Sequence, residues 1–350
     1  MTERPKTRKK EPTSEEAEAI DRRRKLAWAG ILLLFVIGAG LIAIPYLPKN
    51  GNDAEAATSK LQLKDIPFNG QRAYGYLKQL ADIGPRPSGS PGMAKQQKVI
   101  IDHFKKLGAA VELQKFTSRD PRDGKPVPMC NIIVHWNPQS KKRILLCSHY
   151  DTLPYPMLDP KDPKGRFVGA NDGASSTALL MELGNDMKNV QSQYGVDFVF
   201  FDAEEYVFRE GQPMFLGSEH FAKQYKKNPP GYEYVYAVVL DMIGDANLQI
   251  FYERYSTSWR NSQPLVRQIW NTARRLRVQE FIPQPRHWVL DDHLPLHDTA
   301  GIPSCDIIDF DYYHNNRRVW HTQEDTADKC SPLSLAKVGW VIREWLQTAK

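Results

Sequence analysis

The chain has 350 residues, 47 Lys/Arg against 41 Asp/Glu, a formal net charge of +6 and four cysteines. This length allows one large domain with a full hydrophobic core. The modest charge, without a basic patch interleaved with aromatic residues, argues against a nucleic-acid partner. No CxxC spacing indicates a zinc finger.

The first part of the chain does not have the pattern of a globular domain. Residues 1–25 form a charged tail that ends in the basic cluster Arg22–Lys25. The following residues carry no charge up to Leu47, and about 20 apolar residues suffice to cross a bilayer. We therefore expect a transmembrane signal-anchor helix over residues 26–48. The basic cluster favours a cytoplasmic tail and places the rest of the chain in the periplasm or outside the cell.

A cleaved signal peptide is the alternative interpretation of this segment. The small-residue stretch Ala54–Ala56 resembles a cleavage site, but its distance from the apolar run favours a retained anchor. In either case the remainder faces an oxidising compartment, which allows one or two disulfides without indicating their pairing. Residues 49–66 are expected to be a polar linker, and residues 67–350 the catalytic domain.

Helical and strand patterns alternate along the expected domain. Helical spacing predicts helices over 70–83, 91–107, 174–188, 217–225, 262–277 and 331–348. Short apolar runs predict strands over 111–116, 130–136, 143–147, 196–201, 234–240 and 303–308. The polar stretch 117–128 is expected to be a surface loop. This alternation predicts a single α/β domain with a mostly parallel central sheet and helices on both faces.

One predicted strand leads directly into adjacent carboxylates. The apolar run that ends at Phe201 is followed by Asp202, Glu204 and Glu205. Open α/β sheets bind ligands at the carboxyl ends of their strands. Two neighbouring glutamates repel each other unless a positive group lies beside them, so the pair indicates either a solvated turn or a cation site.

Similar strand-end or turn positions hold four other polar residues. They are His149, Asp172, Asp241 and His321. Helix capping or core packing would explain each of them singly. Imidazole and carboxylate groups are ligands of zinc, however, and their recurrence at strand ends predicts a zinc site.

In order and context, this set resembles the zinc-dependent aminopeptidases of metallopeptidase family 28, including their glutaminyl cyclase branch, over Pro67–Leu346. The resemblance implies a phosphorylase/hydrolase-like zinc exopeptidase fold. It implies that the main zinc ligands are Asp172, Glu205 and His321. His149 and Asp241 would complete a second zinc site that Asp172 bridges, and Glu204 would be the general acid/base.

Further stretches resemble the cyclases in particular. The segment Asp291–Pro295 is similar to a cyclase segment that carries an active-site aspartate and a histidine. Trp320 matches a tryptophan of the pocket wall. The resemblance thus implies catalytic roles for Asp241 and Asp291 beside Glu204, and substrate contacts from Trp320, His293 and Trp288. Cyclases also carry a tryptophan shortly after the second glutamate, which residues 206–210 lack, and Trp288 or Phe208 are its candidate replacements.

The ligand set itself fits two chemistries. A cyclase with one zinc ion would convert the N-terminal glutamine of a peptide or protein to pyroglutamate and release ammonia. An aminopeptidase with two zinc ions would hydrolyse the first residue from a peptide. A non-catalytic ectodomain would be expected to have lost ligands or Glu204, and none is lost. The outer residues favour the cyclase.

Overall fold

The computed structural model describes residues 58–350. The predicted basic tail, the predicted transmembrane helix and the first part of the predicted linker lie outside the described residues. From residue 58 onward, no helix is both long and apolar enough to cross a membrane.

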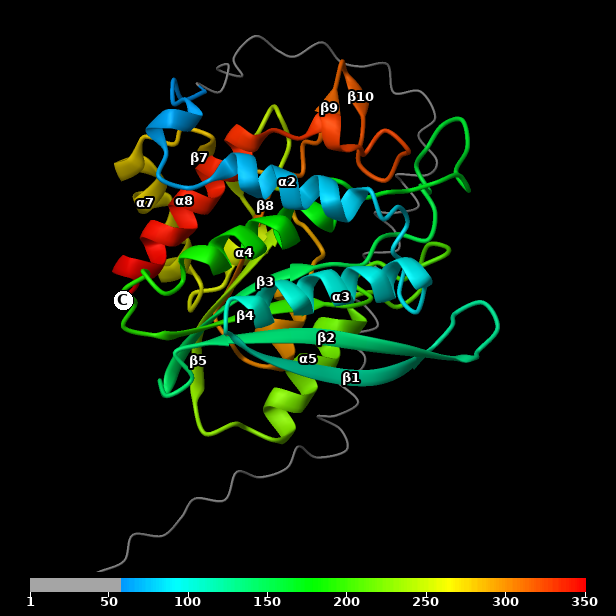
Figure 1. Cartoon of the computed structure of the whole chain (residues 1–350), viewed down its shortest axis with the longest axis horizontal. Helices are drawn as coiled ribbons and strands as arrows, with labels where there is room; N and C mark the ends of the chain where they lie inside the picture. The colour runs from blue at the N-terminus through cyan, green and yellow to red at the C-terminus, as the bar shows by residue number, and fades with distance from the viewer. Residues whose placement is uncertain (1–57) are drawn as a thin grey trace, which may run out of the picture. The chain divides into compact units, whose positions relative to one another are not determined.

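Helices and strands alternate along the described chain (Figure 1). The α-helices are α2 (Gly70–Ala81), α3 (Pro91–Lys106), α4 (Ala174–Asp186), α5 (Leu216–Lys227), α6 (Arg254–Ser258), α7 (Gln263–Leu276) and α8 (Pro332–Thr348). Short helical turns are η1 (Leu63–Asp65), η2 (Pro295–Thr299) and η3 (Ala327–Lys329). The strands are β1 (Ala110–Arg119), β2 (Pro126–Trp136), β3 (Lys142–His149), β4 (Gly195–Phe201), β5 (Glu233–Asp241), β6 (Ile250–Tyr252), β7 (Phe281–Pro285), β8 (Ser304–Ile308), β9 (Tyr313–His314) and β10 (Arg317–Arg318).

A six-stranded central sheet has the order β1-β2-β4-β3-β5-β8. Strands β4, β3, β5 and β8 run parallel to one another, whereas β1 and β2 form an antiparallel edge. The sheet is therefore mixed, and its parallel part is the predicted one. The chain goes from β3 to β4 on one side and then to β5 on the other side of β3. Sheets of this kind bind ligands at such a switch point.

Helices cover both faces of the sheet, as predicted. Along β4, Phe198 and Phe200 pack in the core with α2, α3, α4, α7 and α8, whereas Val199 and Phe201 pack in the core with α5 and η2. Figure 1 shows α3 and α4 in front of the sheet and α5 behind it. Burial on both faces explains why β4 is apolar at nearly every position.

The expected surface loop over residues 117–128 is mostly strand. β1 continues to Arg119, which pairs with Pro126 at the start of β2, so only the residues between them turn. This edge of the sheet leaves many side chains of β1 exposed. An antiparallel edge tolerates polar residues on its solvent side. Because this part of β1 and β2 is rich in polar residues, its sequence resembles that of a loop.

The packed domain begins before the expected boundary at residue 67. Ile66 is buried in the main core, and Leu61 and Leu63 pack against it. The backbone N–H and the hydroxyl of Ser59 both donate to Glu280 Oε1 at 2.9 Å. The end of the predicted linker is thus part of the fold.

None of the four cysteines forms a disulfide, and all of them are buried thiols. Cys147 packs in the core on one face of the sheet, whereas Cys305 and Cys330 pack on the other. The disulfides that an oxidising compartment would allow are not formed, because these thiols serve as small apolar core residues.

Candidate active site

Three neighbouring parallel strands bring predicted site residues to one edge of the sheet. His149 is the last residue of β3, Asp241 is the last residue of β5, and Glu204 and Glu205 closely follow β4. Asp172 lies just before α4, in the turn that the N-cap Gly173 completes. His321, the last of the six predicted ligand and acid/base residues, lies in the loop after β10.

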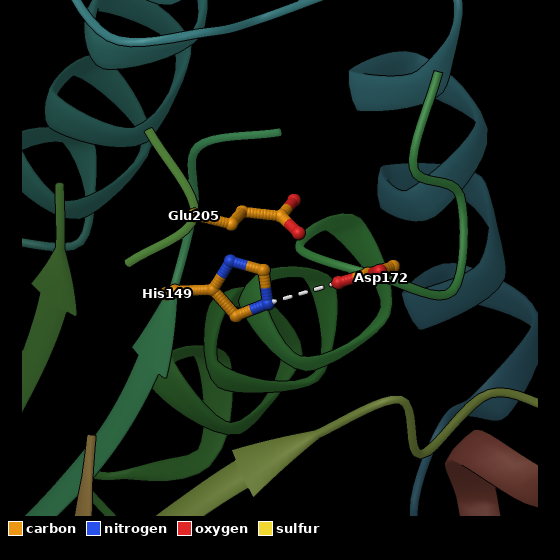
Figure 2. A group of neighbouring side chains, drawn as sticks. All are labelled: His149, Asp172 and Glu205. Carbon is orange, nitrogen blue, oxygen red and sulfur yellow. Dashed lines mark ion pairs between the residues drawn. The ribbon is translucent and has the colours of Figure 1, made fainter. Parts of the chain in front are cut away.

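Asp172 lies between the two histidines. Its Oδ1 is 3.3 Å from His149 Nε2, and its Oδ2 is 3.4 Å from His321 Nε2. Asp241 Oδ1 lies 3.1 Å from His149 Nε2, and Glu205 Oε2 lies 3.3 Å from His321 Nε2. Figure 2 shows the side chains of His149, Asp172 and Glu205 converging on one point. The predicted ligands thus form two sets that share Asp172.

The chemistry of these side chains fits zinc. Asp172 Oδ2 is buried without a hydrogen-bond partner. Burial lowers the pKa of His149, yet the carboxylates around it, Asp241 first, raise that pKa well above its ordinary value. Burial and the neighbouring His149 and Arg318 lower the pKa of His321 to about 3, so its imidazole is neutral. A pocket that favours positive charge and offers neutral imidazole and carboxylate oxygens has the donor set of a zinc site.

Glu204 lies beside this set and is itself buried. Its Oε2 is 4.0 Å from His149 Nδ1. Burial raises the pKa of Glu204 well above its ordinary range, and the charges of Glu205 and Asp291 raise it further, against the opposite effect of His149. A carboxyl group whose pKa is raised above its ordinary range accepts and returns a proton more readily near neutral pH, which suits general acid/base catalysis.

Two buried carboxylates that the sequence prediction did not assign hold the site in place. Asp151 accepts hydrogen bonds from the backbone N–H groups of Glu204 at 3.0 Å and Glu205 at 3.2 Å. Asp325 accepts from the backbone N–H groups of Asn171 at 2.8 Å and Asp172 at 3.1 Å. Their one signal in the sequence is proximity, since each follows a predicted histidine ligand by two to four positions.

Left-handed backbone marks the same region. The φ angles are 60° at Ala203, 45° at Met242 and 58° at His321. Such values are uncommon for residues other than glycine and gather at functional sites. Each of these residues is a predicted ligand or directly adjoins Glu204 or Asp241.

The predicted aromatic residues differ in their surroundings. The ring centroids of Trp320 and His321 lie 3.9 Å apart, so the Trp320 ring contacts a predicted ligand, and its position in the pocket wall stays a prediction. Trp288 is 56% exposed and contacts Tyr255, with 4.7 Å between ring centroids. Phe208 packs instead against Tyr206 and under the Arg122 guanidinium. Of the two candidate replacements for the missing tryptophan, Trp288 is the more exposed, whereas Phe208 is half-buried.

The structure corrects the expected role of His293. This side chain is fully buried, and its Nε2 lies 3.2 Å from Glu253 Oε2, so it offers no surface to a substrate. Asp291, two positions earlier, is also buried. Burial and the charge of Asp241 raise the pKa of Asp291 to about 6. Asp291 is thus close enough to interact electrostatically with Asp241 and with Glu204.

Comparison with known proteins finds similar sequences and structures among glutaminyl cyclases and zinc exopeptidases. The sequence profile of peptidase family M28 matches residues 131–346. The crystal structure of a glutaminyl cyclase from Fimbriiglobus ruber has 40% sequence identity, covers 84% of this chain and 100% of its own, and gives a TM-score of 0.76. A Zn-dependent exopeptidase from Parabacteroides distasonis has 30% identity, covers 80% of this chain and 98% of its own, and gives a TM-score of 0.73. The glutaminyl-peptide cyclotransferase of Gloydius blomhoffii is 28% identical over 288 residues, 72% of this chain and 75% of its own.

Proposed function

The chain belongs to peptidase family M28, and on that premise we propose that it is a zinc-dependent glutaminyl-peptide cyclotransferase. Its substrates would be peptides or proteins with an N-terminal glutamine. The observation that carries the proposal is Glu204, a buried carboxyl beside the predicted zinc ligands, with Asp291 and Asp241 close by. The 40% identity to a glutaminyl cyclase over most of the chain supports the same choice.

The predicted zinc ligands would be Asp172, Glu205 and His321. A zinc ion held there supplies a Lewis acid that polarises the γ-carbonyl group of the glutamine. Asp151 and Asp325 fix the backbone on either side, so the ligands are already oriented before substrate binds. The rigid placement matters because ring closure within one bound residue depends chiefly on positioning.

Glu204 would move the proton. The α-amine of the substrate attacks the γ-carbonyl carbon, a C–N bond forms, and Glu204 accepts the proton that the amine loses. The bond to the amide nitrogen then breaks, and Glu204 returns the proton to the departing ammonia. Asp241 and Asp291 would bind the amine and hold Glu204 in the protonation state that each step needs. Trp320, with Trp288 at the exposed side, would line the pocket.

A zinc aminopeptidase is the second candidate, and one observation favours it. The two carboxylate oxygens of Asp172 face different histidines, which is the arrangement that two metal ions bridged by one carboxylate require. The similarity to a Zn-dependent exopeptidase points the same way. In this reaction Glu204 would be the general base for a water molecule. A non-catalytic domain is a weaker third candidate, since all predicted ligands and Glu204 are present.

Two peptides distinguish these reactions. The full chain is incubated with a Gln-initiated peptide and, separately, with a Leu-initiated peptide of otherwise identical sequence. The cyclase produces a mass loss of one ammonia from the first peptide and leaves the second intact. Release of free leucine from the second would replace the proposal by the aminopeptidase, and no change in either peptide would favour a domain without catalysis.

We also propose that residues 26–48 anchor the protein in a membrane, with the catalytic domain on the extracytoplasmic side. The uncharged segment and the basic cluster before it support this proposal. An anchored protein stays in the membrane fraction after alkaline carbonate extraction and keeps its original N-terminus. Recovery of a soluble form that begins near Ala57 would instead identify a cleaved signal peptide.

A further inference from the structure

The stretch Arg254–Gln279 concentrates the positive charge of the chain. It contains six arginines and no aspartate, glutamate or lysine, whereas the formal net charge of the whole chain is only +6. A glutamate borders the stretch on each side, but both Glu253 and Glu280 are buried. The excess charge is therefore local, and helix α7 lies in the middle of it.

Helix α7 has one side in the core and one side in water. The residues that it buries are Leu265, Val266, Ile269, Trp270, Thr272 and Ala273. Arg267, Asn271 and Arg274 are exposed and follow one another at four and three positions, so they share one face of the helix. Arg275 flanks this face, and Arg277 is exposed at the C-cap. We call the four arginines Arg267, Arg274, Arg275 and Arg277 the α7 basic face.

The charges of the α7 basic face are hardly compensated within the domain. Among residues 58–350, the guanidinium groups of Arg267, Arg274 and Arg277 form no ion pair, and Arg275 forms one at 4.0 Å with Glu344. The side chain of Arg275 remains 52% exposed. Arg274 donates a hydrogen bond to the neutral side chain of Asn271 at 3.0 Å. These guanidinium groups are thus available to an anionic partner outside the domain.

The composition of the face points to phosphate groups as that partner. All of its cations are arginines, whose planar guanidinium group binds phosphate oxygens through two parallel hydrogen bonds. Nucleic-acid sites that bind unpaired bases also need exposed rings for stacking. Trp270 is only 5% exposed, and Trp259 stacks on His297 with 3.7 Å between ring centroids. The absence of an exposed ring on α7 favours phospholipid headgroups over nucleic acid.

The beginning of the described chain is fixed beside this helix. Glu280, three residues after Arg277, accepts the two hydrogen bonds from Ser59 and one from Lys337 Nζ at 2.7 Å. Figure 1 shows the first described residues beside the region of α7 and β7. The proposed membrane anchor ends at residue 48, eleven residues before Ser59, and so many residues span at most about 40 Å. An anchored chain would therefore keep the C-terminal end of α7 close to the lipid headgroups.

We propose that the α7 basic face binds the phosphate groups of anionic phospholipids and holds the catalytic domain in one orientation on the membrane. This inference rests on the proposed membrane anchor and holds for either of the proposed reactions. Because the anchor keeps the face near the bilayer, a few weak phosphate contacts suffice. Their strength should fall with added salt, since salt screens the attraction between exposed charges.

Arginine modification of the full chain tests this surface. The chain is reconstituted into nanodiscs of phosphatidylcholine alone or of phosphatidylcholine mixed with phosphatidylglycerol. Phenylglyoxal modifies exposed guanidinium groups, and mass spectrometry of peptides measures the rate at each arginine. The rates at Arg267, Arg274 and Arg277 should be several-fold lower in the anionic nanodiscs, and high salt should restore them. Arg119 and Arg209, exposed on β1 and in the loop after β4, should react equally in both.

A double variant tests whether the arginines act together. In Arg267→Gln/Arg274→Gln, the anionic nanodiscs should no longer protect Arg277, because most of the face has lost its charge. Arg119→Gln/Arg209→Gln is the matched control, which removes two exposed arginines elsewhere and should leave the protection of Arg277 intact. Equal rates at the α7 basic face in both kinds of nanodisc would overturn the proposal for the wild-type chain.

Failure of the anchor has a different signature from failure of this inference. A chain without an anchor does not stay in nanodiscs of either composition, and the same modification is then measured on the released protein with vesicles of the two compositions. Protection by anionic vesicles would still support the lipid-binding face, and equal rates would overturn it. Protection by a short DNA duplex but not by anionic vesicles would replace the lipid by nucleic acid.

Discussion

Glu204 and Glu205 are neighbours in the chain with different surroundings. Glu205 Oε1 accepts the backbone N–H of Leu153 at 2.7 Å, and its Oε2 faces His321 at 3.3 Å. Glu204 has no such anchor on its carboxylate among the hydrogen bonds of the described residues, and its nearest positive partner is His149 at 4.0 Å. A fixed carboxylate suits a metal ligand, whereas a freer and more easily protonated one suits proton transfer.

This division of roles predicts the effect of Glu204→Gln. The amide keeps the size of the side chain but cannot accept a proton, so turnover should fall by about 10² to 10⁴-fold. Bound zinc should be unchanged, because Glu204 is not one of the predicted ligands. Ammonia release and metal content are measured on the same preparation. Near wild-type turnover would remove Glu204 from the acid/base role, and loss of zinc would make it a ligand.

The sequence predicts the polar residues of the site better than their supports. His149, Asp172, Glu205, Asp241 and His321 could be found because each stands at or near the end of a predicted strand or in a turn, and the structure brings them together. The orienting roles of Asp151 and Asp325 could not, since a carboxylate that binds backbone N–H groups has no pattern of its own. His293 was misassigned because a motif indicates that a residue is near a site but not which way its side chain points.

At the level of elements, the turn before α4 is a sensitive point. Gly173 has a φ angle of 91°, and a Cβ atom there would lie 2.5 Å from the backbone oxygen of Asp151 and 3.3 Å from the imidazole of His149. Gly173→Ala should therefore displace Asp172 or His149 and weaken zinc binding, at a cost in stability of about 1 to 3 kcal/mol. Zinc titration of the metal-free variant and thermal unfolding measure both effects.

Gly108→Ala is the matched control for the backbone strain alone. Gly108 follows α3 with a similar φ angle of 76°, but a Cβ atom there would meet nothing within 4 Å. This variant should lose stability and keep the zinc affinity of wild type. If both variants bind zinc equally well, the close approach at Gly173 does not position the ligands.

The antiparallel edge of the sheet contains a pH-sensitive contact. His135 on β2 lies 2.8 Å from Asp197 on β4. Asp197 and Glu112 raise the pKa of His135 to about 9. A raised pKa in the folded state stabilises the fold fully below the ordinary pKa of histidine, and this contribution is lost as the pH rises through about 9. Wild type should thus lose about 1 kcal/mol from this contact between pH 7 and pH 10.

His135→Gln removes the titrating group and should flatten that part of the pH dependence in urea unfolding. His220→Gln is the control, because burial lowers the pKa of His220 and its charge does not change over this alkaline range. A His135→Gln variant with the same alkaline loss as wild type would show that other groups cause it.

Across the whole molecule, the strands that could be predicted are those whose burial requires a continuous apolar sequence. Strands β3, β4 and β5 are covered on both faces and appear in the sequence as continuous apolar runs. The extension of β1 and β2 beyond the expected strands could not be predicted, because their polar residues face water on an edge. The short strands β6 and β7 escaped notice as well, since a strand of three to five residues has too little pattern to identify.

The folded domain begins before residue 67, and the sequence pattern does not indicate this because it depends on packing between distant parts of the chain. A fragment that begins at residue 67 lacks Ile66, which is 6% exposed in the core, and lacks the two hydrogen bonds from Ser59 to Glu280. Burial of an isoleucine side chain contributes about 1.5 to 3 kcal/mol. Thermal unfolding should therefore occur several degrees lower for residues 67–350 than for residues 58–350. Ser59→Ala in the longer fragment removes the hydroxyl hydrogen bond to Glu280 and keeps the backbone one, so it should account for only a small part of the difference. Equal melting of the two fragments would place the boundary at residue 67 after all.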